Sequence, residues 1–272
     1  MIVQSAPQGG KHFVITMDQH TSFSAQLASA FGNEQFEAIE PRSQMLHVIE
    51  HHDAGWRDLD AAALRDPETG LPYNLVKTPF ERILKTSSAS PDFNGKTHPF
   101  CELMSSMHSW GLYNGRYGMS EKVLLDGLAD ENRSNADTML NHEIARQKRL
   151  KSELSSNPET AAWIDDLHLF QNYKQLQLFD TMALYFNCFH PGSRGQDTFT
   201  HVPTTAESDT SVSIEELGDG RYRLAPFPFQ GQDVEVSFNG RYMSPVDSGD
   251  DVKEILDRAP IETQTVRLVR NR

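Results

Sequence analysis

The stretch His51-His52-Asp53-Ala54-Gly55-Trp56 places an adjacent His-Asp pair at the end of a segment with helical apolar spacing. His20 lies upstream of this pair and Asp180 lies far downstream, and each falls in a segment that also has helical spacing. Two imidazoles and two carboxylates brought together from three helices can hold one divalent metal ion. Whether these four residues meet therefore decides between a plain helical domain and a metal-dependent enzyme.

Asp180 and His52 lie on the apolar faces of their predicted helices. Leu176 and Leu184 flank Asp180 at four-residue spacing, and Val48 lies one turn before His52. A buried ionised carboxylate costs several kcal/mol unless it is paired or bound to a metal. The pattern therefore predicts a metal-binding cluster inside the fold, and the alternative is a helical bundle with buried, hydrogen-bonded polar residues.

The composition excludes several classes of protein. The chain has 272 residues, 38% of them hydrophobic, and 25 basic against 38 acidic residues give a net charge of −13. An acidic surface repels nucleic acids and anionic membranes, so we expect neither as a partner. The sequence lacks a membrane-length apolar run, a signal-peptide pattern and a disulfide framework. We expect a cytoplasmic protein with a small-molecule substrate, and self-association into a homo-oligomer stays open.

Helical periodicity covers most of the chain up to residue 190. The predicted helices span about residues 18–31, 41–53, 99–113, 135–155 and 159–188. The segment between the second and third of these is harder to assign. Asp66-Pro67-Glu68-Thr69-Gly70-Leu71-Pro72 is typical of a turn and residues 87–95 of a polar loop, with a short helix expected between them.

The pattern changes after His190-Pro191-Gly192, where alternating apolar residues predict strands. These strands are expected at about residues 211–214, 222–224, 234–238 and 265–269. Gly218-Asp219-Gly220 and Asn239-Gly240 are expected to form hairpin turns, and residues 1–16 form an N-terminal hairpin that can pair with the strands. We therefore predict a mainly α fold, in which a helical domain over residues 1–190 carries a small β-rich appendage over residues 191–272.

The order His20, His52-Asp53, Asp180 resembles the HD-domain superfamily of metal-dependent phosphohydrolases, in which a His, an adjacent His-Asp pair and a distant Asp bind a metal. The segments at residues 18–28, 52–56 and 66–72 also look like an uncharacterised bacterial family of HD-like proteins. The resemblance implies an HD-domain-like helical bundle. It also implies that His20, His52, Asp53 and Asp180 bind a divalent ion, which is Mn, Fe, Ni, Co, Zn or Mg.

One position departs from the superfamily. Many members have a lysine shortly after the His-Asp pair, whereas this chain has Trp56 followed by Arg57. Trp56 cannot contact phosphate by charge, so the candidates for binding phosphate are Arg57, Lys96 and Arg116. Each of the three also fits a solvated surface residue. We expect a phosphorylated substrate, and a substrate that is not a phosphoester is the alternative.

His108 is the candidate for a further ligand or for an acid, because it extends the apolar side of the helix predicted over residues 99–113. The alternative is a core histidine that binds a backbone carbonyl. His51 points roughly 100° away from His52 around the helix. In the expected hydrolysis, Asp53 orients a metal-activated water, His108 protonates the leaving oxygen and Arg57 offsets phosphate charge.

The expected function is thus a metal-dependent hydrolase, namely a phosphohydrolase of a small phosphorylated metabolite or nucleotide. Two other functions stay open. HD-like bundles with extra histidines can host a di-metal oxygenase, and a non-enzymatic binding or signalling domain can keep a vestigial metal site. An intact ligand set argues against the second of these, because buried polar ligands with nothing to bind are destabilising.

Overall fold

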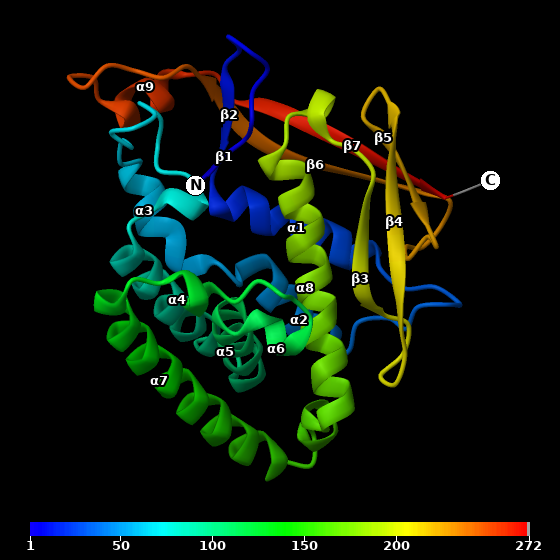
Figure 1. The fold of residues 1–272 in the computed structure, drawn as a ribbon. Coiled ribbons are helices and arrows are strands. Elements are labelled where there is room, and N and C mark those ends of the chain that lie inside the picture. Colours follow the sequence, from blue (N-terminus) through cyan, green and yellow to red (C-terminus); the bar gives the residue numbers. More distant parts are fainter. Residues whose placement is uncertain (271–272) are drawn as a thin grey trace.

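One curved sheet contains strands from both ends of the chain (Figure 1). In this computed structural model, which describes residues 1–270, the seven strands run in the order β1-β2-β6-β7-β5-β4-β3. All neighbouring strands pair antiparallel except β5 and β7, which are parallel. The strands are β1 (Ile2–Val3), β2 (His12–Ile15), β3 (Asp197–Pro203), β4 (Asp209–Gly218), β5 (Arg221–Ala225), β6 (Asp233–Met243) and β7 (Glu262–Arg270).

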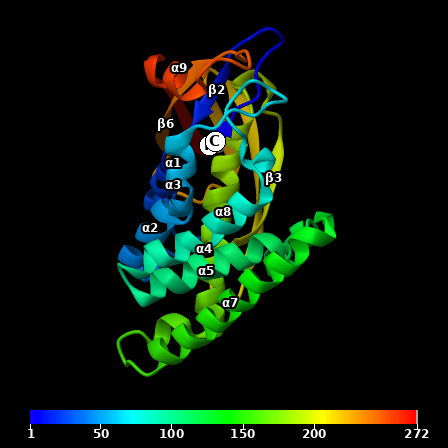
Figure 2. The same ribbon diagram turned by 90° about the vertical axis from the view of Figure 1, so that its left-hand side faces the viewer.

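Most of the helices pack in layers on one side of this sheet (Figure 2). The α-helices are α1 (Met17–Ala30), α2 (Arg42–His51), α3 (Arg57–Ala62), α4 (Phe80–Gly95), α5 (Pro99–Tyr113), α6 (Gly115–Gly118), α7 (Asp130–Ser155), α8 (Asp166–Cys188) and α9 (Val252–Arg258). The 3-10 helices are η1 (Ala54–Trp56), η2 (Leu75–Lys77), η3 (Leu124–Gly127), η4 (Ala161–Ile164) and η5 (Pro191–Ser193). α1 and α8 lie against the sheet, whereas α4, α5 and α7 form a layer farther from it (Figure 2). None of the described helices is long and apolar enough to cross a lipid bilayer.

The N-terminal hairpin expected over residues 1–16 is present. β1 pairs with β2, where Val3 lies opposite Val14, and β2 pairs with β6, where Phe13 lies opposite Tyr242. The hairpin therefore extends the sheet that the C-terminal strands form.

Aromatic side chains join the helices and the sheet in one core. Phe23 of α1 packs against Phe186 of α8 and Phe238 of β6, with ring centroids 5.6 and 5.1 Å apart. Phe186 also packs against Tyr222 of β5, at 4.9 Å between centroids. All four side chains are buried, and burial of a side chain such as Phe contributes about 1.5–3 kcal/mol relative to exposure.

The prediction of a mainly α, HD-domain-like bundle with a small β-rich appendage is wrong. Helices hold 51% of the residues and strands 20%, and the seven-stranded sheet makes this an α/β fold. The physical reason is the shared core: α1 and α8 cover the apolar face of the sheet, so neither layer is an appendage of the other. Residue 190, the expected domain boundary, falls between α8 and β3, and residues on both sides of it enter this core.

The polar stretch over residues 87–95 is helical, although a loop was predicted, because α4 runs through it with Pro91 in its interior. Pro91 has no N–H to donate to the carbonyl of Ser87, and the hydroxyl of Ser109 donates to that carbonyl at 2.8 Å instead. The hydroxyls of Ser87 and Ser90 donate to carbonyls one turn back on α4. Packing against α5 therefore overrides the local composition.

The turn predicted at Asn239-Gly240 is a strand, because β6 continues through it to Met243. A Cβ on Gly240 would lie 2.6 Å from Cε1 of Phe13, so this glycine makes room for a ring. The turn predicted at Gly218-Asp219-Gly220 does connect β4 to β5. After β6 the chain forms α9, where no helix was expected.

Candidate metal centre

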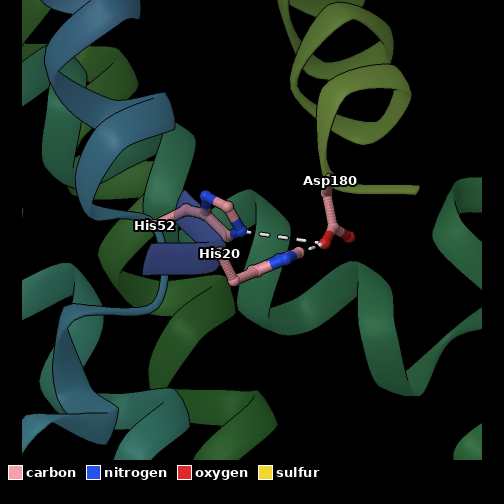
Figure 3. Close-up of side chains that lie close together, drawn as sticks. All are labelled: His20, His52 and Asp180. Carbon is pink, nitrogen blue, oxygen red and sulfur yellow. Dashed lines mark hydrogen bonds and ion pairs between the residues drawn. The ribbon is translucent and has the colours of Figure 1, made fainter. Parts of the chain in front are cut away.

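Helices from distant parts of the sequence bring four polar side chains together. His20 comes from α1, His52 and Asp53 follow the end of α2, and Asp180 comes from α8. Nε2 of His20 lies 3.2 Å from Oδ1 of Asp180, and Nε2 of His52 lies 3.7 Å from the same oxygen (Figure 3). Nε2 of His52 also lies 3.7 Å from Oδ2 of Asp53. The residues that the sequence grouped therefore meet at one place.

His108 of α5 joins the same cluster. Two sets of three residues each offer ligand atoms within 4.8 Å of one another: His20, His52 and Asp180 form one set, and His52, Asp53 and His108 form the other. The ring centroids of His52 and His108 lie 4.8 Å apart. Because both sets use His52, the five residues form a single cluster with His52 at its centre.

The backbone determines the tautomer of His52. Its Nδ1 lies 2.8 Å from the carbonyl oxygen of Ile49, which can only accept a hydrogen bond, so Nδ1 carries a proton. Its Nε2 is buried and has no hydrogen-bond partner among residues 1–270. An unpartnered buried polar group costs about 1–3 kcal/mol. A metal ion bound to Nε2 would remove that cost.

His20 is oriented in the same way. Its Nδ1 lies 2.9 Å from Oδ1 of Asn187, and its Nε2 faces Asp180. One ring nitrogen bound to a carbonyl oxygen, with the other nitrogen facing the site, is the usual arrangement of metal-ligating histidines. Asn187 lies two turns after Asp180 on α8, so one helix supplies both a ligand and the group that orients its neighbour.

The side chains of this cluster fit a divalent first-row ion. Imidazole nitrogen and carboxylate oxygen are suitable ligands for Mn, Fe, Co, Ni and Zn. The separations of 3.2 and 3.7 Å between the histidine nitrogens and Asp180 are those expected of atoms that each lie about 2.0–2.2 Å from one ion. His20, His52, His108 and Asp180 are buried, and the side chain of Asp53 is 14% exposed.

Burial and charge shift the protonation of this cluster. Burial alone would lower the pKa of His52, but the carboxylates of Asp53 and Asp180 outweigh it and raise that pKa to about 9. Burial acts to raise the pKa of Asp180, but the imidazoles of His20 and His52, whose Nε2 atoms lie 3.2 and 3.7 Å from its Oδ1, hold that pKa well below its usual range. Burial raises the pKa of Asp53. In the metal-free protein, a protonated His52 therefore balances part of the carboxylate charge.

His108 is neutral at physiological pH. Burial, together with the charge on His52, lowers the pKa of His108 to about 3. Its Nδ1 lies 2.8 Å from Nε2 of Gln177, whose Oε1 is buried without a partner in the described part of the chain. A half-turn of this amide would let Nδ1 donate to Oε1 and leave Nε2 of His108 free for an ion. A neutral imidazole suits a ligand, and its N–H is too weakly acidic to protonate a leaving group at pH 7.

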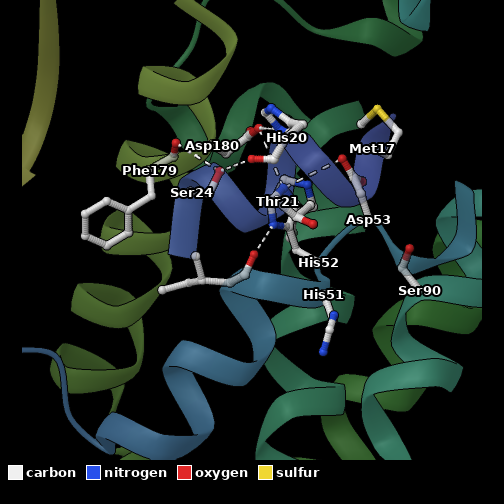
Figure 4. Close-up of polar contacts among 12 residues, drawn as sticks. Met17, His20, Thr21, Ser24, His51, His52, Asp53, Ser90, Phe179 and Asp180 are labelled. Atoms are coloured by element: carbon white, nitrogen blue, oxygen red, sulfur yellow. Dashed lines mark hydrogen bonds and ion pairs between the residues drawn. The ribbon is translucent and has the colours of Figure 1, made fainter. Parts of the chain in front are cut away.

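The turn after the His-Asp pair is pressed against α4. The N–H of Gly55 donates to Oγ of Ser90 at 3.0 Å, and a Cβ on Gly55 would lie 2.2 Å from the carbonyl oxygen of Thr86. Glycine at this position therefore lets η1 approach α4 closely enough to place Asp53. Figure 4 shows that His51 points away from the cluster, as its place on the helix predicts.

Ser24 holds α1 close to α8 beside the cluster. Its hydroxyl lies 3.1 Å from the carbonyl oxygen of His20 and 3.3 Å from that of Phe179 (Figure 4). This short polar side chain is buried where the two helices pack together. The close approach brings His20 and Asp180 face to face.

A cavity of about 460 Å³ lies beside the cluster, a size that suits a small organic ligand. His20, Asp53, His108 and Asp180 all line it. Much of the remaining wall is apolar and comes from α4, α5, α8 and the short helices η1, η2 and η3. The potential ligands are therefore accessible to a molecule that enters this cavity.

Arg116 reaches the cavity from an unusual turn. Its Nη2 lies 3.4 Å from Oδ2 of Asp180. Residues 115–118 all have positive φ, with Arg116 at 50° and Tyr117 at 57°, so α6 is a left-handed turn. Left-handed geometry costs a non-glycine residue about 1–2 kcal/mol. This left-handed turn places the guanidinium of Arg116 beside Asp180.

Arg57 and Lys96, the two other cations proposed for phosphate, lie elsewhere. Nε of Arg57 lies 3.0 Å from Oδ1 of Asp18, and its guanidinium lies 4.5 Å from the centroid of the Phe93 ring. Nζ of Lys96 lies 5.7 Å from the same ring. Arg57 lines a separate hollow that it shares with Asp18. The structure thus places the proposed catalytic Arg57 away from the cluster.

A family model described as a protein of unknown function, DUF3891, matches residues 1–245. The chain belongs to this family. The matched range includes the five cluster residues and Arg116, and it extends through β6. Comparisons with curated proteins and with solved structures gave no match. The likeness to the HD-domain superfamily therefore rests on the order of His20, His52-Asp53 and Asp180.

Two amide side chains that contact the cluster of this DUF3891 protein were not predicted from the sequence. Asn187 orients His20, and Gln177 contacts His108. Gln177 lies one turn before Asp180 and Asn187 two turns after it, so all three share a face of α8. Helical spacing around a buried ligand is the signal that could have identified them.

Proposed function

We propose that this protein is a metal-dependent hydrolase that acts on a phosphate ester. The observation that carries the proposal is Nε2 of His52. This nitrogen is buried and lacks a hydrogen-bond partner within the described residues, and four further ligand-type side chains gather around it beside a cavity. A purely structural cluster would bring one of the two carboxylates, which lie 3.7 Å away, to within hydrogen-bond distance of this nitrogen.

Each side chain of the site has its own role in the proposed hydrolysis. A divalent ion held by the cluster would lower the pKa of a water molecule and polarise a phosphoryl oxygen. Asp53 lines the cavity, and its raised pKa suits a base that takes a proton from that water. Arg116 is placed to bind a phosphate oxygen, which Arg57 cannot do from its position over Phe93. His108 serves as a ligand rather than as the acid, because its pKa is about 3.

A di-metal oxygenase has less support. Both potential ligand sets contain His52, whose Nδ1 is bound to Ile49, so both sets depend on the same Nε2. One imidazole nitrogen binds one ion, and the cluster therefore suits a single metal. A vestigial, non-enzymatic site has less support, because the carboxylates of Asp53 and Asp180 stay 3.7 Å from Nε2 beside a cavity instead of closing to hydrogen-bond distance.

We also propose that the protein works in the cytoplasm. Cys101 and Cys188 are both free thiols, as expected in a reducing compartment. Burial raises their pKa values to about 12 and about 11, so neither thiol is ionised at neutral pH.

Metal analysis of the purified protein, followed by phosphatase and phosphodiesterase assays, tests the hydrolase. Candidate ions are Mn, Fe, Co, Ni, Zn and Mg, and we expect the activity to disappear with a chelator and return with one of them. Asp180→Asn keeps the shape of the side chain but removes its charge. This variant should lose metal and activity while the helix content measured by circular dichroism stays nearly unchanged.

Asp165→Asn is the matched control for that variant. Asp165 caps the N-terminus of the same helix, where Asn is an equally good cap, so metal content and activity should be retained. Full metal occupancy in the Asp180→Asn protein would remove Asp180 from the site. A wild-type protein that binds none of the ions would contradict the proposal as a whole.

A further inference from the structure

Away from the ligand cluster, apolar side chains wall the cavity. Phe80 and Ile83 of α4, Leu112 of α5 and Leu184 of α8 all line it. A sugar or a nucleobase placed against these side chains would lose its hydrogen bonds to water without receiving others. An apolar group would instead gain from burial of its surface.

The hydroxyl groups that line the cavity are already engaged within the protein. Those of Thr78, Ser87, Ser90 and Ser109 each donate to a backbone carbonyl oxygen at 2.8–3.2 Å. The hydroxyl of Tyr113 lies 3.1 Å from Oγ of Ser87, whose own proton goes to a carbonyl. These groups have no free hydrogen to donate to a polar substrate and can only accept from it, so this wall offers a polar substrate few hydrogen bonds.

The charge balance suits a single anionic group. Arg116 is the one Lys or Arg side chain among the described residues that line the cavity. Together with a divalent ion it outweighs the carboxylates of Asp53 and Asp180 by one positive charge. A phosphate monoester, with a charge of about −2 at pH 7, exceeds this by only about one charge, whereas a nucleoside di- or triphosphate would bring several uncompensated negative charges into a mostly apolar cavity.

The rim of the cavity is also apolar. Val76 of η2 is 78% exposed and Leu124 of η3 is 51% exposed, and both line the cavity. Two exposed apolar side chains thus stand where the cavity meets solvent. The apolar path therefore continues from the wall of the cavity to solvent.

We propose that the substrate is the monophosphate ester of a single apolar alcohol, with its phosphate between the ligand cluster and Arg116 and its chain or ring along the helical wall. This inference rests on the proposed hydrolase and specifies its substrate. In the reaction the P–O bond to the alcohol breaks, and the hydroxyl of water bonds to phosphorus. The remaining proton of that water ends on the departing oxygen. The products are inorganic phosphate and the free alcohol, with no change of oxidation state.

Binding of alkylphosphonates tests the substrate class without requiring turnover, because their C–P bond is not hydrolysed. Titration calorimetry on the protein loaded with Mn²⁺ or Zn²⁺ would compare methyl-, butyl- and octylphosphonate with adenosine 5′-monophosphate. We expect the affinity to rise by about fourfold per buried methylene. Adenosine 5′-monophosphate should bind no better than methylphosphonate. The same trend should appear in kcat/KM for the corresponding alkyl phosphates.

Two variants of half-exposed leucines locate the binding surface. Leu124→Asp puts a charge on the rim, and because the side chain is 51% exposed, the fold should tolerate it. We expect octylphosphonate to bind about tenfold more weakly or worse, and methylphosphonate to bind as in wild type. Leu167→Asp is the control, because Leu167 is equally exposed but lies on the first turn of α8. It should leave the binding of both ligands unchanged.

The outcomes separate the two proposals. Affinity that rises with chain length, without hydrolysis of any phosphate ester, would overturn the hydrolase and support this ligand class. Alkyl phosphates hydrolysed at rates independent of chain length would overturn this inference and leave the hydrolase standing. Adenosine 5′-monophosphate bound as tightly as octylphosphonate would also overturn it.

Discussion

The Nδ1 atom of His52 lies 2.8 Å from the backbone carbonyl oxygen of Ile49, one helical turn earlier. This contact turns Nε2 toward Asp53 and Asp180 and determines which nitrogen can bind an ion. Against the effect of burial, the two carboxylates raise the pKa of His52 to about 9. An ion and a proton therefore compete for the same nitrogen.

We expect metal binding at pH 7 to release a proton from His52, because Nε2 must lose its proton before it can bind an ion. This release should fall toward zero as the pH rises above about 9, where Nε2 is already deprotonated. Titration calorimetry in two buffers with different ionisation enthalpies counts the protons. His142→Ala, which changes a side chain that is 64% exposed, should release as many protons as wild type. Binding at pH 7 without proton release would contradict the raised pKa of His52.

Asn187→Ala should weaken metal binding without removing a ligand. The substitution takes away the oxygen that accepts from Nδ1 of His20, and loss of such a partner typically costs about 10–100-fold in metal affinity. Asn172→Ala is a matched control on the same helix, because Asn172 is also buried but donates to the carbonyl of Glu40. Both variants should lose similar stability, and only Asn187→Ala should bind metal more weakly in a competition titration. Equal affinities would show that Asn187 does not position His20.

The cluster could be predicted from the sequence because its members break local patterns. His52 and Asp180 stand on apolar helix faces, where a charge needs a partner, and helical spacing alone identifies those faces. The position of Arg57 could not be predicted in this way. It depends on η1, the short 3-10 helix that places the start of α3, and on the contact with Asp18 far away in sequence.

The size and role of the sheet could not be predicted, because strand pairing is not local. Alternating residues indicated most strands, but β2 pairs with β6 from the other end of the chain, and β5 lies beside β7 rather than β6. Nothing in a short strand shows which helix will cover it. Asn239-Gly240 illustrates the limit: its composition favours a turn, but the ring of Phe13 occupies the space above Gly240 and the strand continues.

Gly55→Ala should destabilise the fold and disturb the site together. The added Cβ would lie 2.2 Å from the carbonyl oxygen of Thr86, so η1 must move away from α4, and overpacking of this kind costs about 1–3 kcal/mol. Asp53 precedes η1 directly, so metal affinity should fall as well. Gly195→Ala is the control, because its Cβ would meet no atom within 4 Å in the described structure. Urea unfolding and metal titration of both variants test this, and an unaltered Gly55→Ala protein would refute the close approach.

Arg116→Asn should separate stability from ligand binding. Asn tolerates the left-handed region, so relief of strain at Arg116 offsets the lost contact with Asp180, each effect being about 1 kcal/mol. We therefore expect a nearly unchanged free energy of unfolding, together with a loss of about tenfold or more in affinity for octylphosphonate, since the anion loses its guanidinium partner. Ala63→Gly relieves a left-handed residue outside this cavity and should leave ligand affinity unchanged. If the Arg116→Asn protein binds octylphosphonate as tightly as wild type does, the guanidinium does not bind the anionic group of the ligand.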